Sequence, residues 1–196
     1  MLFEEAGKHI LGKLSDQLPV RLTYHNADHT MDVYFAAQFI GHHENIKAEE
    51  MKLLLTAALY HDSGFLVRDK GHEEESCLIA KNTLPAYNYR VEEIELICGM
   101  INATKVPQSP KNLLEKILAD ADLDYLGRDD FFTIGRQLFI ENINSGIICD
   151  EHEWNKIQVL FIKNHNYFTE TALHLRTAKK HDNMHKIQAL INSNLK

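Results

Sequence analysis

Helical spacing of apolar residues is the feature that most constrains the fold of this 196-residue chain. Apolar side chains recur at intervals of three and four residues almost throughout, and no segment alternates convincingly between apolar and polar positions. We therefore predict an all-α fold. The predicted helices cover residues 2–18, 28–41, 48–62, 72–84, 90–103, 112–126, 129–144, 151–164 and 168 onward, the last with a break near Asp182. Asp28 is the predicted N-cap of the second helix, and Gly64 is the predicted stop signal of the third.

Length and composition predict one globular domain. A hydrophobic content of 44% is ordinary for a chain with a real core, and no low-complexity or linker-like segment interrupts it. We predict a single all-helical domain over residues 1–196. Its core covers about residues 20–130, and additional C-terminal helices at about 129–196 pack on that core.

Net charge and cysteine content indicate which partners and which cellular compartment to expect. The formal net charge of −7 disfavours a nucleic acid polymer, although it allows a small phosphorylated ligand at a local cationic site. No apolar run approaches the ~18–20 residues of a membrane span, and the N-terminus lacks a signal-peptide pattern. Three cysteines with no CxxC pair predict free thiols in the cytoplasm rather than a zinc–thiolate site.

Ligand-type side chains stand on the apolar faces of three predicted helices. His29 shares a face with the buried residues of its helix, His61 continues another such face and precedes Asp62, and Asp122 follows the apolar stripe of a third. Each has an ordinary explanation alone, such as a core histidine bonded to a carbonyl oxygen or an aspartate paired with arginine. Two buried carboxylates without a counter-charge would, however, cost several kcal/mol. A single divalent cation would neutralise both.

The donor set favours a catalytic metal over a structural one. Two histidines and two aspartates suit Mn, Fe, Ni, Co or Zn, with Mg as a further option, better than Ca. With only four protein ligands, an octahedral ion would keep positions open for water or substrate. We predict one such metal.

Three local strings resemble the HD superfamily of metal-dependent phosphohydrolases. They are YHNADH at 24–29, HDSG at 61–64 and ADADLD at 119–124, and the resemblance extends over about residues 24–126. It implies an HD-domain helical bundle with His29, His61, Asp62 and Asp122 as the metal ligands. Asp120 is the nearest rival to Asp122, which is preferred because it lies on the apolar stripe.

The resemblance also implies roles for residues near the ligands. His25 resembles the histidine that acts as general acid in cyclic-nucleotide phosphodiesterases, but it would equally serve to cap the helix or pack beside a neighbour. His72, in HEEES at 72–76, resembles a histidine that binds a second metal or contacts the substrate phosphate in some relatives. Lys105 would supply positive charge to a phosphate. Solvent-facing side chains are the alternatives for His72 and Lys105.

Together these residues predict a metal-dependent phosphohydrolase that acts on a small phosphate ester or nucleotide. The metal would activate a water molecule, Asp62 would orient or deprotonate that water, and His25 would protonate the leaving group. The expected partner is a small, nucleotide-like phosphorylated substrate, and a homodimer is left open. One alternative is a signalling module that binds nucleotide or metal without turnover. Another, a di-iron HD-type oxygenase, is disfavoured because residues 99–104 contain no histidine for a second iron.

Overall fold

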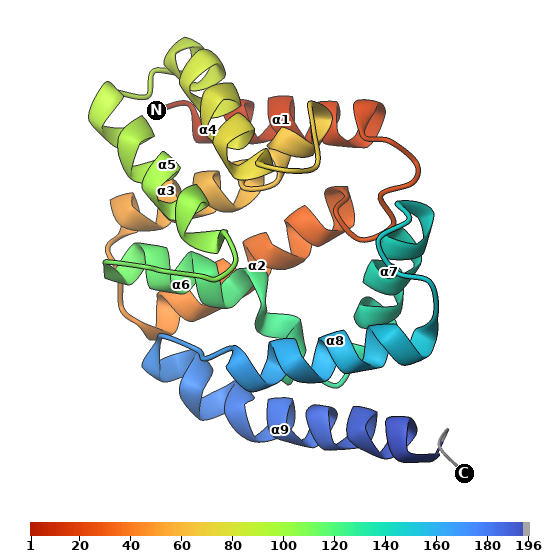
Figure 1. Cartoon of the computed structure of the whole chain (residues 1–196). Helices are drawn as coiled ribbons and strands as arrows, with labels where there is room; N and C mark the ends of the chain where they lie inside the picture. Colours follow the sequence, from red (N-terminus) through yellow and green to blue (C-terminus); the bar gives the residue numbers. More distant parts are fainter. Residues whose placement is uncertain (194–196) are drawn as a thin grey trace. The chain divides into compact units, whose positions relative to one another are not determined.

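The computed structural model describes residues 1–193, and these residues form helices and connecting turns without any strand (Figure 1). The all-α prediction is confirmed. The α-helices are α1 (Phe3–Gln17), α2 (Ala27–His43), α3 (Ala48–Tyr60), α4 (His72–Thr83), α5 (Val91–Thr104), α6 (Leu113–Asp122), α7 (Phe131–Asn144), α8 (Glu151–Asn164) and α9 (Glu170–Ser193). Three short 3₁₀ helices join them: η1 (Ser63–Leu66), η2 (Leu84–Tyr87) and η3 (Asp124–Gly127). Within the described part of the chain, no helix combines the length and apolar character that crossing a membrane requires.

The chain divides into two compact units. The first comprises Met1–Pro19 and His25–Asp122, and its core is built around α3, which packs on α1, α2 and α5. Every side chain of α3 from Leu53 to Tyr60 is buried. Helix α2 also packs on α6. This packing brings together the first turn of α2 and the C-terminal ends of α3 and α6.

The second unit comprises residues 20–24 and 123–193 among those described. Its core includes Leu126, Phe131, Ile162 and Ile187, and α8 packs on α9. The prediction of one domain, with the C-terminal helices packed on the core, stays a prediction.

Helix α9 differs from its predicted course because it continues unbroken past Asp182. The predicted break was wrong. The polar residue at this place, Asn183, is buried within the continuous helix. Asn183 is 1% exposed, and its amide donates hydrogen bonds to the carbonyl oxygens of Leu126 (3.0 Å) and Arg128 (3.1 Å). A buried amide with two acceptors is satisfied, so the helix needs no break there.

Candidate metal centre

The first turn of α2 positions His29. Asn26, in extended backbone conformation, caps the helix: its Oδ1 accepts hydrogen bonds from the backbone N–H groups of Asp28 (2.9 Å) and His29 (3.1 Å). The prediction of Asp28 as N-cap was therefore wrong, because Asp28 already lies inside the helix. The cap fixes the backbone of His29, whose side chain is buried.

The end of α3 positions His61 and Asp62. The His61 ring is fully buried, and its Nδ1 lies 2.8 Å from the carbonyl oxygen of Ala58. Because a carbonyl only accepts, Nδ1 carries the proton, and in the neutral ring Nε2 presents its lone pair. Metal-binding histidines are commonly oriented in this way, by a hydrogen bond from the ring nitrogen that does not bind the metal. Asp62 follows in the turn before η1, and it is also buried.

The last residue of α6 is Asp122, and it meets both histidines. Its Oδ1 lies 3.3 Å from Nε2 of His29 and 3.5 Å from Nε2 of His61. Asp120, the rival candidate, is fully buried but stands two residues away, so its side chain leaves α6 in a different direction. The structure thus places Asp122 with the histidines.

Three of the four predicted ligands, His29, His61 and Asp122, bring ligand atoms within 4.8 Å of one another, and Asp62 lies beside both histidines. Oδ2 of Asp62 lies 3.4 Å from Nε2 of His29 and 3.3 Å from Nε2 of His61, and the two Nε2 atoms are 3.4 Å apart. Bonds of about 2.1 Å to a common metal would separate neighbouring donor atoms by roughly 3.0 Å in octahedral and 3.4 Å in tetrahedral geometry. The separations that involve the two histidines, 3.3–3.5 Å, lie near the upper end of this range.

An unsatisfied oxygen supports the same interpretation. Oδ2 of Asp62 is buried and accepts no hydrogen bond from any residue that the structure describes. An orphaned buried carboxylate oxygen is costly unless a cation satisfies it. Its position among two imidazole nitrogens and a second carboxylate fits a divalent transition metal.

The electrostatics of the cluster favour bound positive charge. Burial lowers the pKa of His29 and His61, but the carboxylates of Asp62 and Asp122 outweigh it and raise both, that of His61 well above 6.5. Burial raises the pKa of the two aspartates, but the histidines outweigh it, so the pKa of Asp62 falls well below its usual range and that of Asp122 falls to about 2. The two carboxylates therefore favour positive charge at this point, which a divalent cation would supply.

His72 lies at the other oxygen of Asp62. It is the first residue of α4, and its Nδ1 is 2.9 Å from the carbonyl oxygen of Asp69. Its Nε2 is 3.4 Å from Oδ1 of Asp62 and 3.7 Å from Oε1 of the buried Glu73. Oδ2 of Asp62 therefore faces His29 and His61, whereas Oδ1 faces His72.

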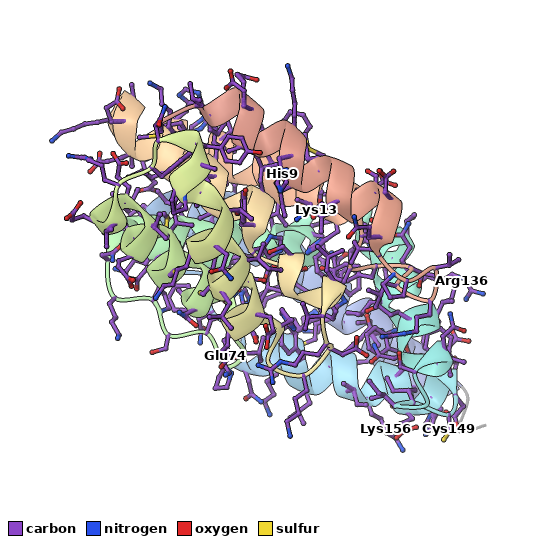
Figure 2. All side chains as sticks on the ribbon, turned by 90° about the horizontal axis from the view of Figure 1, so that it is seen from above. His9, Lys13, Glu74, Arg136, Cys149 and Lys156 are labelled. Carbon is purple, nitrogen blue, oxygen red and sulfur yellow. The ribbon has the colours of Figure 1, made fainter. Side chains whose placement is uncertain are left out.

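His25 also lies beside the cluster, at the residue before the cap of α2. Its ring centroid is 5.9 Å from that of His29 and 6.2 Å from that of His72. Lys105 follows α5 and forms an ion pair with Glu74 of α4, which is labelled in Figure 2. His25 and His72 thus lie beside the predicted ligands, whereas Lys105 is paired with the Glu74 carboxylate.

Gly64 and Ser76 are two residues whose part in the site the sequence did not reveal. Gly64 does not stop a helix; it lies in η1, and a Cβ there would be 1.9 Å from the carbonyl oxygen of His72. Its N–H donates to Oγ of the fully buried Ser76 (2.8 Å). The turn after the His-Asp pair therefore contacts the start of α4 at His72 and is hydrogen-bonded to it at Ser76. The serine four residues after His72 was the available signal.

Phe65, the residue after Gly64, was also missed, since it lies between the predicted helices 48–62 and 72–84. It is buried, and its ring stacks with those of His25 and His72 at centroid distances of 4.4 and 4.1 Å. Sequence alone does not show that rings 40 and seven residues away share this contact.

Comparisons with known proteins place these observations in context. A family profile described as HD domain matches residues 26–124, which include all four predicted ligands. No curated protein matches the chain. Several crystal structures resemble its fold. A predicted HD superfamily hydrolase from an uncultured Thermotogales bacterium is 21% identical, with a TM-score of 0.61 over 98% of this chain and 90% of the other.

Two further similar structures come from Bacillus subtilis and Lactobacillus plantarum. Bacillus subtilis YpgQ, in complex with ADP, is 18% identical, with a TM-score of 0.67 over 97% of both chains. A structural genomics target from Lactobacillus plantarum is 19% identical, with a TM-score of 0.67 over 98% of this chain and 100% of the other. At these identities the likeness shows a shared fold.

Proposed function

This chain belongs to the HD-domain family, and from that premise we propose that it is a metal-dependent phosphohydrolase. The observation that carries the proposal is the cluster of His29, His61 and Asp122, with the unsatisfied Oδ2 of Asp62 beside both histidines. These four residues would hold one divalent transition metal. When bound, such a metal lowers the pKa of a coordinated water and polarises a phosphoryl oxygen.

The neighbouring residues of the chain supply the remaining roles. Asp62, with one oxygen towards the ligand cluster and one towards His72, is placed to orient the attacking water or accept its proton. His25, beside the cluster, would donate a proton to the leaving oxygen. His72 would contact the substrate phosphate. Lys105 would do so by exchanging its ion pair with Glu74 for the phosphate.

We propose a nucleotide-like phosphate as the substrate. The support is the similar fold of Bacillus subtilis YpgQ, whose structure is a complex with ADP. A cytoplasmic location belongs to the same proposal, supported by three free cysteines, of which Cys77 and Cys98 are buried. The non-catalytic alternative, a module that binds nucleotide without turnover, rests on the same cluster and the same ADP complex.

The test combines metal analysis with a substrate panel. Purified protein is loaded with Mn, Fe, Ni, Co, Zn or Mg and assayed on nucleoside mono-, di- and triphosphates, cyclic nucleotides and p-nitrophenyl phosphate. Asp62→Asn keeps the side-chain shape but removes the charge, and should lose metal and activity. We expect kcat/KM to fall by more than the roughly 100-fold that changes to outer-shell partners cost. The control Asp16→Asn, at an exposed position of α1, should retain both.

Two results would count against the proposal in different ways. Full metal content in Asp62→Asn would contradict the ligand assignment. Metal-loaded wild type that binds ADP but hydrolyses nothing in the panel would favour the binding module.

A further inference from the structure

Three aromatic rings meet at the edge of the ligand cluster. The Phe65 ring stacks with the His25 imidazole at 4.4 Å and 24° between planes, and with the His72 imidazole at 4.1 Å and 22°. The two imidazoles are 6.2 Å apart and tilted by 44°, so they do not stack on each other. Phe65 is therefore the ring that both imidazoles share.

Backbone hydrogen bonds connect Phe65 to Asp62 and, through the neighbouring Gly64, to α4. Its N–H donates to the carbonyl oxygen of Asp62 (3.1 Å). The preceding residue, Gly64, bonds to Ser76 and abuts the backbone of His72. Phe65 is only 7% exposed, so its ring has little freedom to move. A ring held in this way offers a fixed flat surface to the two imidazoles that stack on it.

We propose that Phe65 is a positioning residue that holds the imidazoles of His25 and His72 in working orientation beside the metal ligands. The inference rests on the proposed function, since those two histidines are the proposed proton donor and phosphate contact. His72 has a second anchor, because its Nδ1–H donates to Asp69. This hydrogen bond remains when the Phe65 ring is lost, so His72 should largely keep its position, and the activity test detects mainly the displacement of His25.

The activity test uses Phe65→Leu, which keeps an apolar side chain but removes the flat ring. On the panel substrate that wild type turns over best, kcat should fall about 10- to 100-fold, since misplacement of a reacting group by about 1 Å costs this much. KM should change less than about threefold, and metal content should stay at the wild-type level. Phe131→Leu is the matched control, because Phe131 is 1% exposed and stacks on Tyr125 instead of an imidazole. It should keep wild-type kcat.

Double variants separate positioning from a general loss of stability. If Phe65 acts through His25, then adding Phe65→Leu to His25→Ala should lower kcat by less than about twofold further. Equal losses in the wild-type and His25→Ala backgrounds would overturn the inference, and so would a loss no larger than that of Phe131→Leu.

A second readout does not depend on activity. In metal-free protein, the ring current of Phe65 shields the C–H protons of both imidazoles, so their NMR resonances should move downfield in Phe65→Leu. His25→Ala and His72→Ala assign the signals, and the exposed His174 serves as an internal reference. Unchanged resonances of His25 and His72 would refute the stacked arrangement. If wild type hydrolyses nothing yet these resonances shift, the proposed function fails while the arrangement of the rings stands.

Discussion

Gly64→Ala should destabilise the protein strongly, although the change adds only one methyl group. A Cβ at this position would lie 1.9 Å from the carbonyl oxygen of His72, 2.7 Å from its carbonyl carbon and 2.8 Å from its Cα. All three atoms belong to the backbone, so no side-chain rotation relieves the contact. Either η1 or the first turn of α4 has to move by roughly 1.5 Å to reach an ordinary contact of about 3.4 Å.

The cost follows from this displacement. Overpacking of a rigid interior costs about 1–3 kcal/mol. The same movement breaks the hydrogen bond from the Gly64 N–H to Ser76, which is 2.8 Å long and buried, for about 1 kcal/mol more. The sum is about 2–4 kcal/mol. At about 2–4 °C per kcal/mol for a chain of this length, Tm should fall by about 4–16 °C.

Thermal unfolding followed by circular dichroism measures this effect, with Gly12→Ala as the matched control. Gly12 lies inside α1, is exposed, and a Cβ there would meet nothing within 4 Å. Alanine should stabilise that helix by about 0.5–1 kcal/mol. The two identical substitutions should therefore shift Tm in opposite directions. A Tm for Gly64→Ala within about 2 °C of wild type would refute the reasoning.

Three further measurements test the local assignments. Asn26→Ala should lower the free energy of unfolding by about 1 kcal/mol, because two backbone N–H groups lose their acceptor, whereas Asp28→Ala should cost less; chemical denaturation that ranks the variants the other way would contradict the cap. The raised pKa of His29 and His61 means that protons must leave before a cation binds, so affinity for Mn²⁺ should increase with pH above 6.5. Calorimetric titration at several pH values measures this affinity, and an affinity that does not change with pH would contradict the prediction. The same raised pKa values stabilise the metal-free fold below pH 6.5, and this contribution is lost as pH rises through the pKa values of the folded protein. The Tm measured in the presence of chelator should therefore fall as pH rises through these values. A Tm that rises instead would exclude this link between histidine protonation and stability.

The sequence by itself determined the helical architecture and the family resemblance. Both are properties that local patterns carry: apolar spacing records which side of each helix is buried, and short strings record the ligand-type residues on that side. For this reason the predicted bounds of most helices lie within a few residues of the observed ones. It also predicted that His29, His61, Asp62 and Asp122 hold one metal; the structure brings His29, His61 and Asp122 together with Oδ2 of Asp62 beside both histidines, and the assignment of the four as ligands stays a prediction.

Tertiary structure decided how those side chains are held. Asn26 rather than Asp28 caps α2, because backbone geometry and not residue type distinguishes two candidates two positions apart. Gly64 is needed for its close approach to α4, a contact that no helix-end signal describes. Phe65 meets two imidazoles from other segments, and Asn183 is buried because its amide finds carbonyl acceptors more than 50 residues away. Each of these depends on a partner distant in the chain, and the position of that partner is fixed only when the helices pack.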